Sequence, residues 1–200
     1  MKIKLKNIIL NTFLVLFSTY IPLLFTSFFL KTTQFNKDIN QKIKALKSGY
    51  LPIYYPSLSF GDKKELTIYP IGSLPLKKSY LCDEGYGLIT YKTDRFGLRN
   101  PDKNWNNIYK KNNIFIVGDS FIHGACVPEG GTISNNLERT TGINTLAIGM
   151  GGNNPYEYIA SLKSLVSPII QKSSESNIVI LSFYSNDIRA NINLKKESLI

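Results

Sequence analysis

Metal-binding side chains are scarce in this chain of 200 residues, which contains one histidine and two cysteines. A structural zinc ion takes four ligands, mostly cysteine and histidine, so the sequence predicts no metal site. The sequence also has no low-complexity segment and no internal repeat. Its length allows one domain with additional segments.

Acidic residues are few, since 14 Asp and Glu stand against 24 Lys and Arg and the formal net charge is +10. Several lysines flank one apolar segment near the N-terminus, where they suit the anionic headgroups of a lipid bilayer. The basic residues form no stripe interleaved with aromatic side chains, and no nucleic-acid-binding motif occurs. We therefore expect a lipid surface as a partner and no nucleic acid.

The apolar segment covers residues 8–30 and is long enough to cross a bilayer, which takes about 20 residues. A cleaved signal peptide has a shorter apolar core that ends in small residues, whereas the segment here ends in Ser27-Phe28-Phe29-Leu30. A buried core helix fits poorly, because the segment is apolar all round and lysines bracket it. Pro22 is tolerable in a membrane helix. We expect an uncleaved membrane anchor over residues 1–31.

The lysines give conflicting signals on the orientation of this anchor. Lys2, Lys4 and Lys6 favour a cytoplasmic N-terminus by the positive-inside rule. Another five lysines close after the segment favour the opposite orientation: Lys31, Lys37, Lys42, Lys44 and Lys47. Because long domains are translocated largely regardless of charge, we expect a single-pass protein with an extracytoplasmic domain.

Three apolar runs in the second half of the chain end in residues that suit an active site. Residues 114–117 precede Gly118-Asp119-Ser120, residues 145–148 precede a glycine-rich turn that includes Gly152, and residues 178–184 precede Ser185-Asn186-Asp187. Such runs predict buried strands. The intervals between them match a strand-helix-strand unit, which takes roughly 30 residues or more. We therefore expect the three turns at the carboxyl edge of one parallel sheet, where ligands bind in open α/β folds.

In combination, Gly118-Asp119-Ser120, Gly152 and Asn186 resemble the first three sequence blocks of the SGNH (GDSL-type) hydrolases. Residues 91–101 and 118–127 resemble a membrane-anchored, polysaccharide-associated subgroup of that family. The likeness covers residues 82–191. It implies an α/β fold, a flavodoxin-like three-layer domain with a parallel sheet. It also implies a serine esterase or acyltransferase that acts on an acylated glycan or another ester of the cell surface.

The resemblance assigns a role to each turn. Ser120 is the nucleophile, and the backbone amides of Ser120 and Gly152 with the Asn186 side chain form the oxyanion hole. Each such donor is worth about 3–4 kcal/mol, and glycine lets its backbone approach the substrate. Asp119 and Gly118 support the serine turn. The alternative for Ser120 is a helix N-cap with no catalytic role.

His123 is the only histidine and therefore the only candidate for a histidine base. A residue three positions after Ser120 rarely presents its ring along the serine hydroxyl, so we expect His123 to be structural or to line the pocket. The family's fourth block, an Asp-x-x-His that supplies the base, has no counterpart here. Either the sequence is a truncated form of a longer enzyme, or the domain binds an acylated glycan or a partner without catalysis.

The chain after the anchor divides into two parts. Residues 32–80 form a juxtamembrane and extended, Pro-rich segment, and residues 81–200 form a partial α/β domain. Helices are expected over 132–139, ended by Gly142, and over 155–165, with Asn153 or Asn154 as N-cap and with Ile159, Leu162 and Leu165 facing the sheet. The strand over 177–184 is nearly all apolar, which predicts burial on both faces.

Two further features are the pair of cysteines and a glycine-rich string. Cys82 and Cys126 can form a disulfide in an oxidising compartment, which would tie the start of the domain to the loop after Ser120. Two free thiols are the alternative. The string Gly149-Met150-Gly151-Gly152 lacks the full dinucleotide fingerprint and its acidic partner, so we expect no cofactor.

Overall fold

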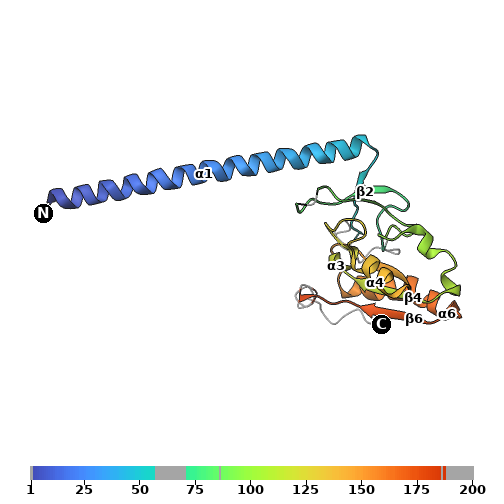
Figure 1. Cartoon of the computed structure of the whole chain (residues 1–200). Coiled ribbons are helices and arrows are strands. Elements are labelled where there is room, and N and C mark those ends of the chain that lie inside the picture. Colours follow the sequence, from blue (N-terminus) through green and yellow to red (C-terminus); the bar gives the residue numbers. More distant parts are fainter. Residues whose placement is uncertain (1, 57–70, 86, 186, 188–200) are drawn as a thin grey trace, which may run out of the picture. The chain divides into compact units, whose positions relative to one another are not determined.

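A computed structural model describes residues 2–56, 71–85, 87–185 and 187 of the chain. The chain divides into two units, Met1–Lys44 and Ala45–Ile200. The first unit belongs to helix α1 (Lys2–Lys47), which runs without interruption past Pro22 (Figure 1). The helix therefore continues beyond the apolar residues into the first part of the segment assigned as juxtamembrane, as far as Lys47. Apolar side chains along residues 13–30 are exposed. By length and composition, α1 is the one described helix able to cross a membrane.

A small sheet opens the second unit. It contains β1 (Leu51–Pro52), β2 (Lys78–Tyr80) and β3 (Thr90–Lys92). Strand β2 lies in the middle, parallel to β1 and antiparallel to β3. In the turn between β2 and β3, the Asp83 carboxylate accepts hydrogen bonds from the N–H groups of Gly85 and Gly87, at 2.8 and 2.9 Å. Strands β2 and β3 thus form a hairpin.

The main sheet has three parallel strands, β4 (Asn113–Gly118), β5 (Asn144–Gly149) and β6 (Asn177–Leu181). Strand β4 lies between β5 and β6, and all six of its residues are buried. The register places Gly118 opposite Gly149 and Val117 opposite Leu181. The three strands therefore end at one edge of the sheet, as expected from their spacing.

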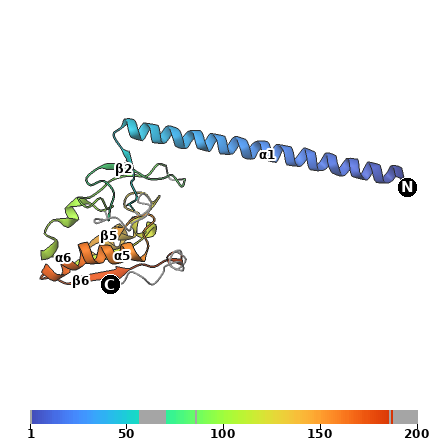
Figure 2. The same ribbon diagram turned by 180° about the vertical axis from the view of Figure 1, so that it is seen from behind.

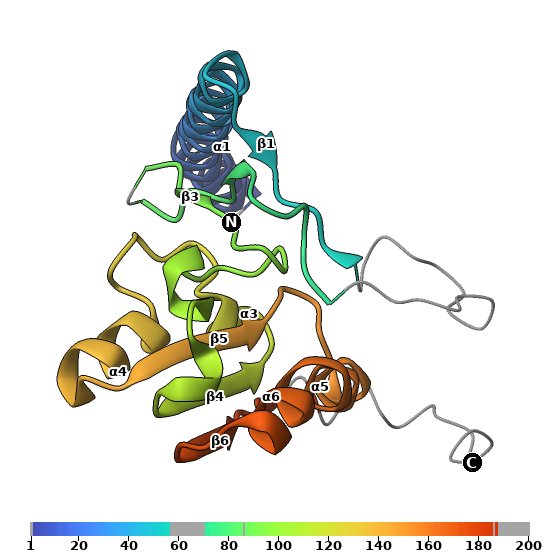
Figure 3. The same cartoon turned by 90° about the vertical axis from the view of Figure 1, so that its right-hand side faces the viewer.

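Helices cover both faces of this sheet (Figure 3). Phe115 and Val117 point from β4 into one core together with Tyr158 and Val166 of the α5–α6 segment. The alternate residues of β4, with Ala147 of β5, pack in a second core against α3 (Ser120–His123) and the partly buried Leu137 of α4 (Ile133–Thr141). This alternation follows from the two-residue period of a strand and makes the unit a layered α/β structure.

The helix boundaries follow the expected caps. Thr132 caps α4, and Gly142 ends it in the left-handed conformation at φ 71°. Asn154 caps α5 (Pro155–Ser161) in a capping box with Glu157. The helical path then continues through a π turn, η4 (Leu162–Val166), and α6 (Ser167–Lys172). Two short 3₁₀ helices, η2 (Asp102–Trp105) and η3 (Ile108–Lys110), precede β4.

One of the three side chains expected to face the sheet does not do so. Leu165 is buried and Leu162 packs against the core, but Ile159 is 47% exposed. The neighbouring Tyr158 takes the inward position instead. The prediction for Ile159 was wrong because the face towards the core follows an i, i+3, i+4, i+7 pattern that starts at Tyr158, and Ile159 lies outside that stripe.

The prediction that the last strand is buried on both faces was also wrong. Strand β6 lies at the outside of the sheet, with α5 and α6 beside it (Figure 2). Its apolar residues Ile178, Val179, Ile180 and Leu181 are each 39–50% exposed. Among the described residues only β4 pairs with it, so half of each side chain remains uncovered.

Candidate active site

Ser120 lies where the central strand ends. It is the first residue of α3, immediately after Asp119, and its side chain is half-buried. Asp119 is the N-cap and accepts a hydrogen bond from the Phe121 N–H at 3.0 Å, so the interpretation of Ser120 as the cap was wrong. Within the described part of the chain, nothing hydrogen-bonds the Ser120 hydroxyl. A hydroxyl at this edge that no cap or network uses is available to a ligand.

The glycines at the ends of β4 and β5 permit a close approach beneath Ser120. A Cβ on Gly118 would lie 2.5 Å from Cγ1 of Ile122, and one on Gly149 would lie 2.8 Å from the Gly118 carbonyl oxygen. Contacts this short exclude any side chain. Both glycines therefore serve to let α3 turn back tightly over the strand ends.

The other two residues expected to form the oxyanion hole follow β5 and β6 in the sequence. Gly152 lies in the exposed turn after β5 and adopts φ 82°, a conformation that favours glycine. Asn186 lies outside the described residues, but both of its neighbours are described. The structure thus brings Ser120, Gly152, Ser185 and Asp187 to one edge of the sheet.

A buried hydrogen-bond network holds the turn after β6. The Tyr158 hydroxyl donates to Asp187 Oδ1 at 2.9 Å, and the Tyr184 N–H donates to Asp187 Oδ2 at 2.8 Å. The Asp187 N–H donates in turn to the Tyr184 carbonyl. Burial, followed by the bond to Asp187, raises the pKa of Tyr158 far above its usual value. Tyr158 therefore stays a neutral donor that fixes this turn beside α3.

His123 is fully buried and does not reach Ser120 through a described bond. Its Nε2 lies 2.8 Å from the Tyr91 hydroxyl, and its Nδ1 has no partner among the described residues. Its ring stands edge-on to those of Tyr55 and Tyr91. Burial, with a smaller contribution from the Arg99 charge, lowers the pKa of His123 to about 3. The imidazole is thus a neutral structural group.

This depressed pKa predicts a pH dependence of stability. The unfolded chain takes up a proton near pH 6.5, whereas the folded chain does so only near pH 3. The contribution of His123 is therefore fully present above pH 6.5. It is lost by about 1.4 kcal/mol per pH unit as the pH falls from 6.5 towards 3.

Urea unfolding of the full chain in detergent at several pH values, followed by Trp105 fluorescence, measures this slope. The His123→Gln variant is expected to lack this part of the slope. Parallel pH profiles of the two proteins would contradict the assignment.

Three contacts tie the segment before β4 to the loop after Ser120. A disulfide joins Cys82 to Cys126, with Cα atoms 5.2 Å apart. The Arg99 guanidinium donates to the carbonyl oxygens of Gly124 and Val127 at 2.6 and 2.8 Å. The third contact is the Tyr91–His123 bond described above. The β2–β3 hairpin and the segment after it therefore hold the loop that follows Ser120 in place.

Asp94 organises that segment from a fully buried position. Its Oδ1 accepts from the N–H groups of Phe96 and Leu98, and its Oδ2 accepts from Asn100 Nδ2 and Trp105 Nε1, all at 2.8–2.9 Å. Burial raises the pKa of Asp94, and these hydrogen bonds oppose that rise. Asn100 in turn pairs with both backbone groups of Ala147. Its amide thereby covers part of the outer edge of β5.

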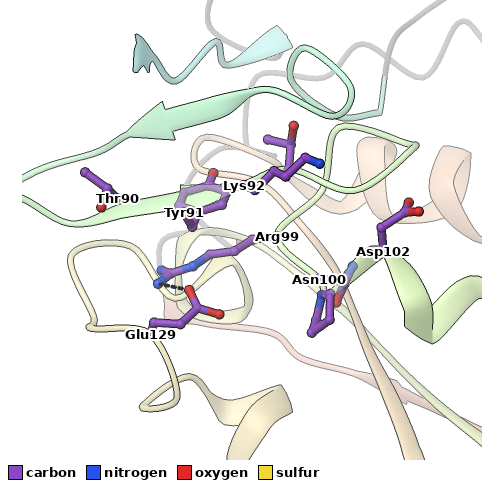
Figure 4. A pocket seen from close by; sticks show the side chains of 9 residues that line it. Thr90, Tyr91, Lys92, Arg99, Asn100, Asp102 and Glu129 are labelled. Carbon is purple, nitrogen blue, oxygen red and sulfur yellow. Dashed lines mark ion pairs between the residues drawn. The ribbon is translucent and has the colours of Figure 1, made fainter. Parts of the chain in front are cut away.

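An open pocket of about 360 Å³ lies beside the Arg99–Glu129 ion pair (Figure 4). The two charged groups are 3.7 Å apart, and Arg99 also lies over the Tyr91 ring at 4.7 Å. Ser120 does not line this pocket. Because the guanidinium is engaged by carbonyl groups, the ring and Glu129, we assign it to holding the loop. Among the described residues, no group of three His, Cys, Asp or Glu side chains is placed to hold a metal ion.

Sequence reasoning missed the roles of several residues near the site. The Asp94-to-Gly97 spacing is a turn signal that was available, but the bonds of Asp94 to Asn100 and Trp105 depend on tertiary packing. The same holds for Arg99 and for the Tyr158–Asp187 bond. No periodic pattern marks such contacts.

Comparison with known proteins adds no relative to this geometry. No protein-family model, curated protein or solved structure matches the chain. The residues of the site therefore carry any functional assignment.

Proposed function

We propose that this chain is a membrane-anchored serine hydrolase of the SGNH (GDSL) type, with a flavodoxin-like domain. Its substrates are acyl esters of a cell-surface polysaccharide. The observation that carries the proposal is the position of Ser120, on a tight glycine-lined turn at the carboxyl end of the central strand, with a hydroxyl that no described residue hydrogen-bonds. In open α/β sheets this edge is where ligands bind.

The chemistry proposed is acyl transfer. The Ser120 hydroxyl attacks the ester carbonyl, the alcohol of the sugar leaves, and the acyl group passes to water or to another sugar hydroxyl. Amide donors of Ser120, Gly152 and Asn186 would stabilise the oxyanion of the tetrahedral intermediate. The glycan as substrate rests on the resemblance of residues 91–101 and 118–127 to the polysaccharide-associated subgroup.

A base is still needed for the serine proton. The sole histidine of the sequence is buried, low in pKa and bonded to Tyr91. We therefore propose that a group other than His123 takes this proton. With the oxyanion donors alone, a serine site of this kind retains only a small part of its rate.

For localisation we propose a single-pass topology. Residues 8–30 of α1 lie in the bilayer, the N-terminal lysines face the cytoplasm, and the second unit lies outside it. The disulfide between Cys82 and Cys126 supports this orientation, because disulfides persist in oxidising compartments.

A second function is favoured by the buried histidine. A domain without a base at its serine can serve as an anchored protein that binds an acylated glycan or a partner without catalysis. In that case the edge of the sheet is a binding surface only.

Turnover of p-nitrophenyl acetate by the full chain in detergent separates the two functions. We expect a slow release of p-nitrophenol above the buffer rate, and we expect Ser120→Ala to abolish it. Ser134→Ala is the matched control, because Ser134 is a serine of α4 outside the site. Equal rates for the protein and its Ser120→Ala variant would favour the binding function.

A further inference from the structure

Two aromatic rings lie next to Ser120 and are half exposed. Phe121 follows the serine directly in α3, and Tyr184 belongs to the turn after β6; their ring centroids are 4.2 Å apart with an angle of 40° between the planes. Their exposed fractions are 49% and 52%. We call this pair the aromatic platform. Large apolar side chains that stay exposed at a ligand-binding edge are candidates for direct contact with the ligand.

Hydrogen bonds to two carboxylates hold the backbone of the platform in place. The Tyr184 N–H donates to the buried Asp187 carboxylate, whose other oxygen accepts from Tyr158. The Asp119 cap fixes the Phe121 backbone. Since both rings start from a fixed backbone, their faces are preorganised and need little ordering when a ligand binds.

The platform segments themselves are uncharged and rich in hydroxyl groups, and the nearest described charges are the two carboxylates, Asp119 and Asp187, that bind their backbone N–H groups. The segments Ser120–Ile122 and Ser182–Ser185 contain no charged residue. Within the described part of the chain, nothing hydrogen-bonds the hydroxyls of Ser120, Ser182 and Ser185. Serine hydroxyls both donate and accept, and aromatic rings offer flat apolar faces. A neutral, ring-shaped ligand with many hydroxyl groups matches this combination, whereas an anion would meet two carboxylates, Asp119 and Asp187, and no positive charge in the platform segments.

We propose that the aromatic platform of Phe121 and Tyr184 binds a neutral sugar ring beside Ser120. The ring stacks its C–H face on the aromatic rings, and its hydroxyls bond to the serines. The sugar is the substrate class of the function proposed above, and the inference rests on that function only for the delivery of the ester to Ser120. Binding itself needs no catalysis.

Calorimetric titration of the full chain, in a detergent without a sugar headgroup, tests the platform. The probes are cellohexaose, xylohexaose and O-acetylated xylohexaose, with hexagalacturonate as the anionic control. We expect at least one neutral probe to bind more tightly than hexagalacturonate. Phe121→Ala and Tyr184→Ala are each expected to weaken that binding about tenfold, the range of one aromatic contact.

The controls separate the rings from the fold and from catalysis. Tyr184→Phe keeps the ring and is expected to keep the affinity. Tyr109→Ala removes a ring of similar exposure in η3 and is expected to change nothing. Ser120→Ala is used only in the turnover assay, where it reports on catalysis and not on the rings.

Three results would overturn the proposal. The wild-type chain binds none of the neutral probes; the two alanine variants bind as tightly as the wild type; or the platform binds p-nitrophenyl decanoate and no sugar, which would assign it to an acyl chain. Sugar binding that depends on both rings, without Ser120-dependent ester turnover, would remove the esterase and keep the platform. Ser120-dependent ester turnover without ring-dependent sugar binding would remove the platform and keep the esterase.

Discussion

Replacement of Asp94 with alanine is expected to lower the free energy of unfolding of the second unit by at least about 4 kcal/mol. The variant leaves four donors without their acceptor, among them the Trp105 indole and the Asn100 amide. Each buried donor left unsatisfied costs about 1–3 kcal/mol. The loss of Asn100 from the edge of β5 adds to this, because Asn100 bonds both backbone groups of Ala147.

Urea unfolding of the full chain in detergent, followed by the fluorescence of Trp105, measures this loss. Asp102→Ala is the matched control, because Asp102 is an exposed carboxylate that pairs with Arg95 at 2.9 Å. Exposed ion pairs contribute about 1 kcal/mol or less, so a small change is expected there. Similar losses for the two variants would show that Asp94 does not organise the segment.

Reduction of the Cys82–Cys126 disulfide is the second large effect. The bond closes a loop of 44 residues, and the entropy of the opened loop corresponds to about 4 kcal/mol in the unfolded state. Reduction is also expected to loosen the loop after Ser120, because Cys126 lies in that loop and the disulfide ties it to Cys82.

Unfolding with and without a reductant measures this contribution, and the Cys82→Ser/Cys126→Ser double variant is the control. The variant is expected to match the reduced protein and to be insensitive to the reductant. An unchanged unfolding midpoint on reduction would mean that the remaining ties, Arg99 and His123, suffice to hold the loop.

The framework of the second unit was predictable from the sequence because each strand has its own local signal. The apolar run before Gly118 predicted β4, and the caps at Asn154 and Gly142 predicted helix ends that the structure confirms. The common edge of Ser120 and Gly152 followed from the spacing of parallel strands. These features depend on neighbours in the chain.

The errors and omissions concern contacts between distant segments. The exposure of β6 depends on which strands lie beside it, which an apolar run does not reveal. The exposure of Ile159 depends on which face of its helix packs on the core, where Tyr158 takes the inward position. Asp94 and Arg99 act through partners that packing brings near. The local sequence pattern was enough to single out Ser120. The residues that hold the neighbouring loop in place could be identified only from the fold.

The most direct test of the central claim, that Ser120 is a nucleophile to which His123 supplies no base, is rescue by imidazole. The rate of p-nitrophenyl acetate hydrolysis is measured with increasing imidazole for the full chain and for its Ser120→Ala variant. Subtracting the variant removes the reaction of imidazole alone. Because a positioned base contributes about 10²–10⁴-fold, we expect a diffusible base to raise the Ser120-dependent rate by about tenfold, with saturation. Identical rates for the two proteins at every imidazole concentration would contradict the claim.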